Sequence, residues 1–206
     1  MIIKSAFSAP GGARGCLLRL NWRLSPVTEA PGRARKAGNR QSGEELVGHM
    51  GNIGLDAEFQ KGALERLLDT DAMLMGRRTY EMLARDWAAQ SGEFADRINS
   101  IRKYVFSSTL EQADWNNSII VRGDVVREVS RLKEQTGPDL AVYGHGLLAQ
   151  TLLRGGLLDE MRLSVFPLFV GSGKLLFREG EGTRLRLIDV TSSPTGVIVM
   201  RYQPAA

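Results

Sequence analysis

Two short segments of the chain combine glycine with residues suited to bind anions: Gly76-Arg77-Arg78-Thr79 and Gly144-His145-Gly146-Leu147-Leu148. Each follows an apolar run and leads into a segment with helical periodicity. Glycine lets the backbone turn tightly and approach a ligand closely, and the free N–H groups at the start of a helix favour an anion. Guanidinium groups match phosphate oxygens, and the Thr79 hydroxyl could donate to a phosphate or cap the helix. Together the two segments predict a ligand with several phosphates or a dinucleotide; the alternative for each is an ordinary strand-to-helix turn.

Hydroxyl groups follow a third predicted strand, at Ser107-Ser108-Thr109. They could bind a phosphate or cap a turn, and taken in isolation the turn is favoured. Gly171-Ser172-Gly173 allows the same two interpretations, and again the turn is favoured.

The sequence indicates no metal site and no catalytic residue. The two histidines, His49 and His145, are far apart along the chain, and Cys16 is the single cysteine. Asp159-Glu160 precedes a predicted strand and is interpreted as a solvated cap. A hydride transfer does not require a side chain that acts as acid or base, because the cofactor supplies the hydride.

Apolar runs and periodic segments alternate through the middle of the chain, where the candidate turns lie. Buried strands are predicted at 72–75, 103–106, 119–121 and 140–143, with a further apolar run at 16–22. Helices are predicted at 56–69, 79–87, 94–100, 125–135 and 147–153. This order predicts an α/β fold with a mostly parallel central sheet covered by helices on both faces. Residues 160–168 alternate, and strands at 184–191 and 196–202 predict a C-terminal antiparallel hairpin added to that sheet.

The 206 residues, with 43% hydrophobic and 24% charged residues, indicate one globular domain over 16–206 with a flexible tail at 1–15. A single cysteine rules out an internal disulfide and fits a reducing cytosol, so a cytoplasmic protein is expected. No apolar run is long enough to span a bilayer. Residues 1–40 hold eight Lys or Arg and one acid, a net of +7 within a total of +4. This basic segment could touch nucleic acid or an anionic surface, act as a transit-like segment, or form the first strand and loop of the domain.

Residues 69–178 resemble dihydrofolate-reductase-like proteins related to the reductase domain of bifunctional riboflavin-biosynthesis deaminase-reductases. The resemblance lies in the two glycine turns, in Lys103 to Leu110, in Trp115-Asn116-Asn117, in Gly156 to Leu163 and in Pro167 to Phe177. It implies a three-layer dihydrofolate-reductase-like fold, NADPH as cofactor, a small-molecule substrate and, often, a homodimer.

The same resemblance implies roles for the candidate residues. The Gly76-Arg77-Arg78-Thr79 and Ser107-Ser108-Thr109 turns would hold the adenosine 2′-phosphate, so that Arg77 and Ser108 select NADP over NAD. The turn from Gly144 to Leu148 would cradle the pyrophosphate. Relatives place Asp-Gly before Ala-Pro-Gly near the nicotinamide, whereas residues 24–32 keep only Ala30-Pro31-Gly32.

Three functional hypotheses follow, in decreasing order of support. The first is an NADPH-dependent reductase of a small heterocyclic substrate, such as a pterin or a riboflavin precursor, or of a carbonyl compound. The second is a non-catalytic nucleotide-binding module on the same fold, because the Asp-Gly pair is missing. Nucleic-acid binding through the basic first 40 residues is a distant third.

Overall fold

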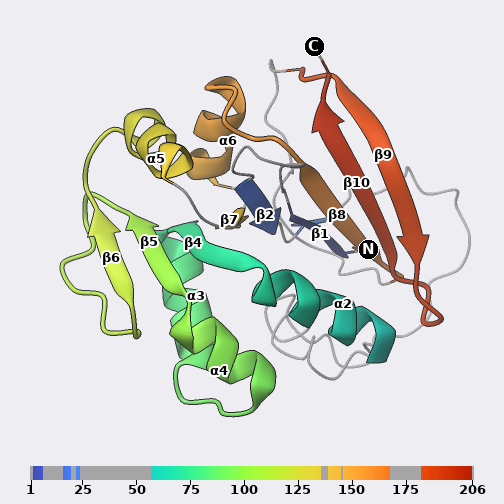
Figure 1. The fold of residues 1–206 in the computed structure, drawn as a ribbon, viewed down its shortest axis with the longest axis horizontal. Helices are drawn as coiled ribbons and strands as arrows, with labels where there is room; N and C mark the ends of the chain where they lie inside the picture. Colours follow the sequence, from blue (N-terminus) through green and yellow to red (C-terminus); the bar gives the residue numbers. More distant parts are fainter. Residues whose placement is uncertain are drawn as a thin grey trace, which may run out of the picture.

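The structure is a computed structural model, and it describes residues 2–6, 16–19, 22–23, 57–135, 139–144, 146–167 and 182–205. Their strands form two five-stranded sheets, one parallel and one antiparallel, with helices packed around the parallel sheet (Figure 1).

The parallel sheet holds the strands that end in the candidate turns. Its order is β2 (Cys16–Arg19), β7 (Asp139–Tyr143), β4 (Thr70–Gly76), β5 (Arg102–Phe106) and β6 (Ser118–Val121). Every neighbouring pair runs parallel. The carboxyl ends of all five strands therefore lie along one edge of the sheet.

Helices cover both faces of this sheet, as the sequence predicts. They are α2 (Ala57–Leu68), α3 (Arg77–Trp87), α4 (Glu93–Ser100), α5 (Val125–Glu134) and α6 (Leu147–Arg154). All five lie within two residues of their predicted positions at each end. Figure 1 shows α5 and α6 on one face, and α2, α3 and α4 on the other.

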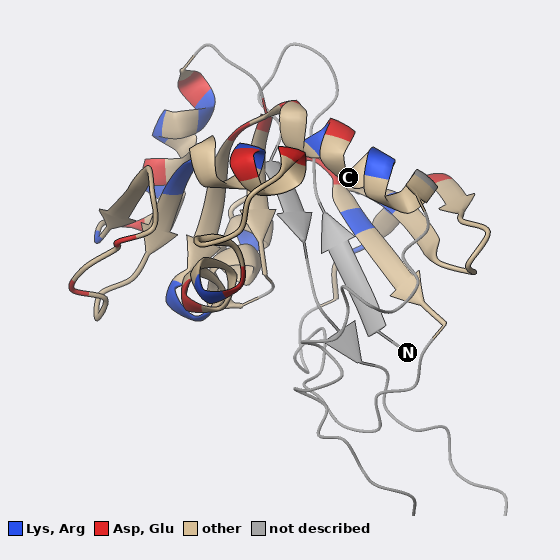
Figure 2. Ribbon diagram, turned by 90° about the horizontal axis from the view of Figure 1, so that it is seen from below, with Lys and Arg blue, Asp and Glu red and all other residues tan. Residues whose placement is uncertain are grey.

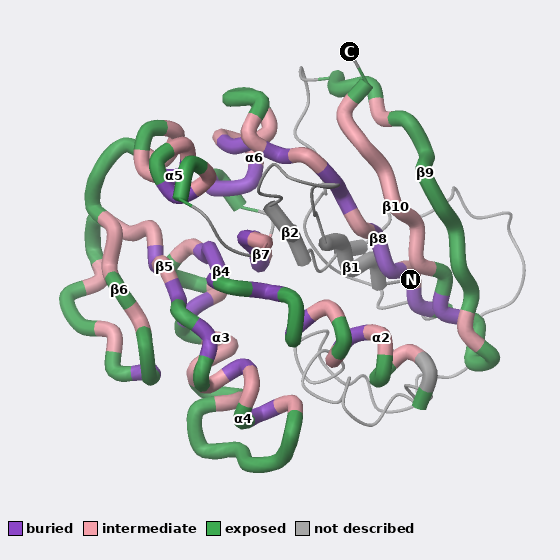
Figure 3. The backbone as a smooth tube through the Cα atoms, viewed as in Figure 1, coloured by how far each residue is buried: buried purple, intermediate pink, exposed green. Residues whose placement is uncertain are grey.

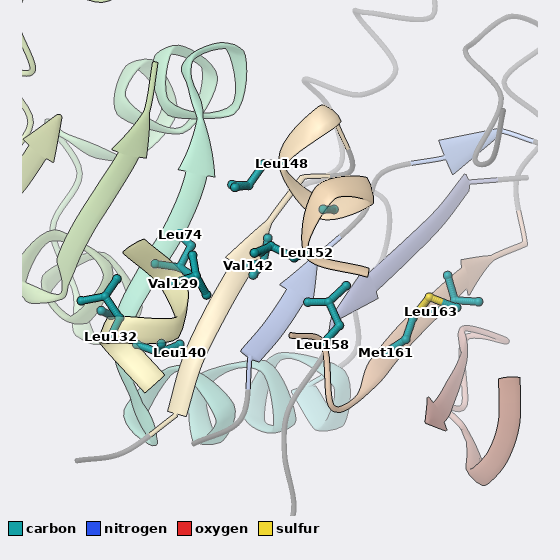
Figure 4. Close-up of a cluster of buried hydrophobic side chains, with 12 residues drawn as sticks. Leu74, Val129, Leu132, Leu140, Val142, Leu148, Leu152, Leu158, Met161 and Leu163 are labelled. Atoms are coloured by element: carbon teal, nitrogen blue, oxygen red, sulfur yellow. The ribbon is translucent and has the colours of Figure 1, made fainter. Parts of the chain in front are cut away.

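Two buried layers explain why the central strands are apolar at consecutive positions rather than at alternate ones. Leu74 and Val142 pack in a cluster with residues of α5 and α6 (Figure 4). Their chain neighbours Met73 and Ala141 belong to a second cluster, with residues of α2, α3 and α4. Side chains of a strand point alternately to opposite faces, so a strand covered on both sides must be apolar throughout. The three-layer α/β fold predicted from the sequence is confirmed.

The antiparallel sheet has the order β3 (Trp22–Arg23), β1 (Ile2–Ala6), β8 (Met161–Phe166), β10 (Ile198–Pro204) and β9 (Leu185–Ser192). The predicted C-terminal hairpin is present as β9 and β10. Its position differs from the prediction, because it joins this second sheet through β8 instead of extending the parallel one. β8 finds its other partner in β1, which lies in the segment predicted as a tail. The rest of that predicted tail, residue 1 and residues 7–15, lies outside the described residues.

The two sheets share one hydrophobic layer. Met161 and Leu163 of β8 lie in the same buried cluster as Leu74 and Val142 of the parallel sheet (Figure 4). On the other face of β8, the ring of Phe166 makes an edge-to-face contact with the ring of Phe59 of α2. Burial is highest in β4 and β7, whereas β9 is exposed along most of its length (Figure 3).

The predicted solvated cap at Asp159-Glu160 is wrong. Glu160 is 2% exposed. Its carboxylate accepts hydrogen bonds from Nε of Arg162, at 2.8 Å, and from Nη2 of Arg201, at 2.7 Å. The hydrogen bond to Glu160 raises the pKa of Arg201. Arg162 and Arg201 face each other across β8 and β10. The carboxylate that they share therefore offsets the repulsion between the two guanidinium groups.

Lys and Arg are interspersed with Asp and Glu along the helices (Figure 2). Within the described part of the chain, no helix is both long and apolar enough to cross a membrane.

Candidate functional site

The three candidate turns lie next to one another at the carboxyl edge of the parallel sheet. β4 is hydrogen-bonded to β7 on one side and to β5 on the other. In register, Met75 pairs with Tyr143, and Gly76 pairs with Phe106. The residues that follow these strands are therefore neighbours in space, although the three turns are spread over about 70 residues of sequence. This edge is where ligands of open α/β sheets bind.

The first turn opens α3 with no cap from a side chain. Gly76 is the N-cap residue, no side chain among the described residues caps the free N–H groups, and the first turn of the helix contains no acidic residue. Arg77 and Arg78 stand there instead. Cations at a helix N-terminus oppose the helix dipole. The start of α3 is therefore a concentrated positive site, which suits a bound anion.

The second turn opens α6 in the same way. Gly146 is the N-cap residue, again without a side-chain cap and without an acid in the first turn. Two other helices differ: Asp124 caps α5 by accepting from the N–H of Arg127 at 2.8 Å, and α4 has two acids in its first turn. The two helices that begin at the predicted turns thus keep free N–H groups of the kind that bind phosphate.

The first and second turns touch at Thr79 and Gly144. Gly144 has φ +81°, a conformation that favours glycine. A β-carbon built on Gly144 would collide with Oγ1 of Thr79. By contrast, a β-carbon on Gly76 or on Gly146 would meet no atom of the described residues within 4 Å. The Thr79 side chain therefore packs directly against the backbone of Gly144, which brings the first and second turns into contact. The space beside Gly76 and Gly146 lets a ligand approach the backbone there.

The third turn is bonded to the first across the ends of β4 and β5. Oγ of Ser107 accepts hydrogen bonds from the N–H groups of Thr109, at 3.2 Å, and Leu110, at 2.9 Å, which forms the predicted turn. Nη1 of Arg77 donates to Oγ1 of Thr109 at 3.0 Å. Arg122, which follows β6, donates to the carbonyl oxygens of Ser108 and Leu110. The structure thus brings Arg77 to the hydroxyl turn, 32 residues away in sequence.

The other predicted site residues differ in what they offer to a ligand. Arg78 and Ser108 are exposed. Leu147 is 68% exposed, whereas the side chain of Leu148 packs in the core at 8%. A ligand would therefore meet Leu148 through its backbone. His145 lies outside the described residues, as do residues 24–32 and the Gly171-Ser172-Gly173 segment. Among the described residues, no group of three His, Cys, Asp or Glu side chains is placed to hold a metal ion.

A buried lysine that was not predicted from the sequence lies away from this edge. Lys103 is fully buried at the start of β5. Its ammonium donates to the carbonyl oxygens of Asn99, Ile101 and Asn116 at 2.7–3.0 Å, and it lies 4.3 Å from the ring centroid of Trp115. Burial lowers the pKa of Lys103 to about 8. One signal in the sequence could have predicted this burial. Lys103 lies two residues before the apolar Val105 in the same strand, so both side chains point to the same buried face.

Comparison with known proteins agrees with this architecture. Residues 34–199 match the RibD C-terminal domain family. The chain belongs to this family. An uncharacterised protein of Bacillus subtilis (strain 168), YyaP, is 29% identical over 147 residues, which cover 68% of this chain and 78% of YyaP.

Two solved structures have a similar fold. A putative riboflavin biosynthesis protein from Shewanella sp. PV-4 matches with a TM-score of 0.57 and 22% identity, over 74% of this chain and 82% of its own. A pyrimidine reductase-like protein from Corynebacterium diphtheriae matches with a TM-score of 0.52 and 16% identity, over 78% of this chain and 86% of its own. The family indicates a reductase-type function for this chain.

Proposed function

We propose that this chain is an NADPH-dependent reductase. In this proposal it transfers a hydride to a small heterocyclic substrate, such as a pterin or a riboflavin precursor, or to a small carbonyl compound. NADPH lies across the carboxyl ends of β7, β4 and β5. The observation that carries the proposal is the bond from Arg77 to Thr109, which sets a guanidinium and a hydroxyl turn together at the uncapped start of α3.

The residues at this edge fit the phosphates of such a cofactor. Arg77, Ser108 and Thr109 would hold the 2′-phosphate, because a guanidinium and two hydroxyls supply directed donors to its oxygens. The N–H groups from Gly146 to Leu148 would hold the pyrophosphate at the start of α6. The open space beside Gly76 and Gly146 supports this placement, since a dinucleotide must approach the backbone closely there.

NADPH supplies the hydride when it is bound, and the protein binds and orients it. The paired turns support that role in a specific way. Thr79 packs against Gly144. This contact fixes the position of the turn that would bind the 2′-phosphate relative to the turn that would bind the pyrophosphate. A rigid relation between the two reduces the ordering cost of binding a long, flexible cofactor.

Calorimetric titration with NADPH and NADH side by side tests the proposal. We expect wild-type protein to bind NADPH at micromolar concentration or better, with NADH much weaker. Arg77→Ala removes a charged phosphate contact worth about 1.5–3 kcal/mol, so NADPH binding should weaken by roughly 10- to 150-fold. NADH binding should change little, because NADH lacks the 2′-phosphate.

Arg131→Ala is the matched control. Arg131 is another exposed arginine paired with a glutamate, and it lies on α5. Its removal lowers the net charge by the same amount and should leave both affinities unchanged. If Arg77→Ala binds NADPH as tightly as the wild type does, the assignment of the site is wrong.

Turnover separates the reductase from the non-catalytic alternative. Oxidation of NADPH in the presence of a pterin, a riboflavin precursor or a carbonyl compound is expected from the reductase. Saturable NADPH binding without oxidation across that panel would instead favour a nucleotide-binding module.

A further inference from the structure

The Arg77 guanidinium is held by two neighbours from different parts of the chain. Its Nε donates to Oε1 of Glu81 at 2.7 Å, one helical turn further along α3. Its Nη1 donates to Oγ1 of Thr109, in the turn after β5. The side chains of Arg77 and Glu81 are 48% and 46% exposed, so the Arg77 guanidinium remains within reach of a ligand at the surface.

Helix stability does not account for this arrangement. An exposed ion pair spaced four residues apart contributes only a few tenths of a kcal/mol. Placing the cation nearer the helix N-terminus is the less favourable order, because it opposes the helix dipole. The pair between Arg77 and Glu81 therefore does little for α3, and its main effect is on the orientation of the guanidinium.

A guanidinium is planar, so fixing two of its nitrogens also fixes the third. With Nε and Nη1 engaged, the Nη2 group of Arg77 has no hydrogen bond to any described residue. The donors on Nη2, and the second N–H of Nη1, remain for a ligand at the carboxyl edge of the sheet. Two such donors on one rigid fork match two oxygens of a phosphate monoester.

We propose that Glu81 is a positioning residue that determines selectivity for NADPH over NADH. It does so by holding Arg77 in the orientation that receives the 2′-phosphate. This inference rests on the proposed function, and it adds a residue that would not itself touch the cofactor. A residue of this kind acts at the 2′-phosphate, chiefly through Arg77, so its removal changes the affinity for NADPH and not for NADH.

The carboxylate of Glu81 also repels a nearby phosphate, which acts in the opposite direction. Two variants separate orientation from charge. Glu81→Ala removes both the acceptor for Nε and the negative charge. Glu81→Gln removes the charge but keeps an oxygen at the same distance from the backbone, and this oxygen accepts from Nε.

The experiment is calorimetric titration of full-length wild-type, Glu81→Ala and Glu81→Gln protein with NADPH and with NADH. We expect Glu81→Ala to weaken NADPH binding about five- to tenfold, the effect of leaving one long side chain to be ordered by the ligand. NADH binding should change less than twofold. Glu81→Gln should bind NADPH within about twofold of the wild type.

Glu128→Ala is the matched control, because Glu128 makes the corresponding surface ion pair with Arg131 on α5. It should leave both affinities unchanged. The inference is overturned if Glu81→Ala binds NADPH as tightly as the wild type does, or if its affinity for NADH falls by the same factor. It is also overturned if Glu81→Gln binds NADPH as weakly as Glu81→Ala does.

Arg77→Ala distinguishes a failure of this inference from a failure of the proposed function. If Arg77→Ala loses NADPH binding but Glu81→Ala does not, only the role of Glu81 is wrong. If the wild type does not prefer NADPH, or if Arg77→Ala has no effect, the proposed function fails and the role of Glu81 fails with it.

Discussion

The buried lysine predicts an unusual dependence of stability on pH. The ammonium of Lys103 is surrounded by the carbonyl oxygens of Asn99, Ile101 and Asn116 and by the ring of Trp115. These groups are neutral, so none of them offsets the loss of hydration with a negative charge. Burial accordingly lowers the pKa of Lys103 from 10.5 to about 8.

The sign of the effect follows from proton binding. Between pH 8 and pH 10.5 the unfolded chain holds a proton on Lys103 that the folded chain has released. Stability therefore rises with pH in this window, and below pH 8 the cost of the buried charge is present in full. The lowered pKa corresponds to a total of about 3 kcal/mol, gained at up to about 1.4 kcal/mol per pH unit.

Lys103→Met tests this reasoning, because methionine has a similar length and does not titrate. The free energy of unfolding is measured by urea denaturation, followed by tryptophan fluorescence, at several values between pH 6.5 and pH 10.5. The wild type minus the variant should be constant below pH 8 and should rise by about 3 kcal/mol by pH 10.5.

Lys61→Met provides the control, because Lys61 is an exposed lysine on α2. It shows how much of the difference comes from removing one positive charge. A difference between wild type and Lys103→Met that stays constant up to pH 10.5 would refute the argument. It would mean that the carbonyl oxygens and the indole ring stabilise the ammonium as well as water does.

Two further predictions concern glycine geometry and a buried charge. Gly144→Ala should reduce the free energy of unfolding by about 2 kcal/mol or more, because alanine must adopt a positive φ and its β-carbon collides with Thr79. Gly146→Ala should leave stability within about 1 kcal/mol, because its β-carbon enters open space, yet it should weaken NADPH binding if the pyrophosphate lies there. Equal stability losses in the two variants, measured by urea denaturation, would contradict this account. Glu160→Ala should cost about 3 kcal/mol or more, since it leaves two facing arginines without their shared carboxylate. In contrast, Glu128→Ala at an exposed ion pair should cost less than about 1 kcal/mol, and a similar loss in both variants would show that the buried carboxylate has no special role.

Local patterns were sufficient to place the elements of the parallel half of the protein. The unbroken apolar run around Met73 and Leu74 indicates a strand that is buried on both faces, and the structure places those two residues in opposite layers. The helical periodicity after Asp124 and after Gly146 likewise predicts α5 and α6. Such signals are readable in sequence because each depends on residues within one or two turns of the chain.

Contacts between distant segments could not be predicted in this way. The sequence shows that Gly76, Ser107 and Gly144 each follow a strand, but it does not contain the strand order that makes them neighbours. The contact between Thr79 and Gly144 and the hydrogen bond from Arg77 to Thr109 both depend on that order.

Charged residues show the same limit most clearly. The sequence predicts a solvated Glu160, and it predicts Lys103 only as one residue of an ordinary strand. The structure buries both, because β10 brings an arginine to Glu160 and the segment from Trp115 to Asn117 covers Lys103. Strands, helices and glycine turns could be predicted from the amino-acid sequence, since they depend on local periodicity and backbone freedom. Which side chains meet and which charges lose their water emerged with the assembled fold, since both depend on pairing between strands far apart in the chain.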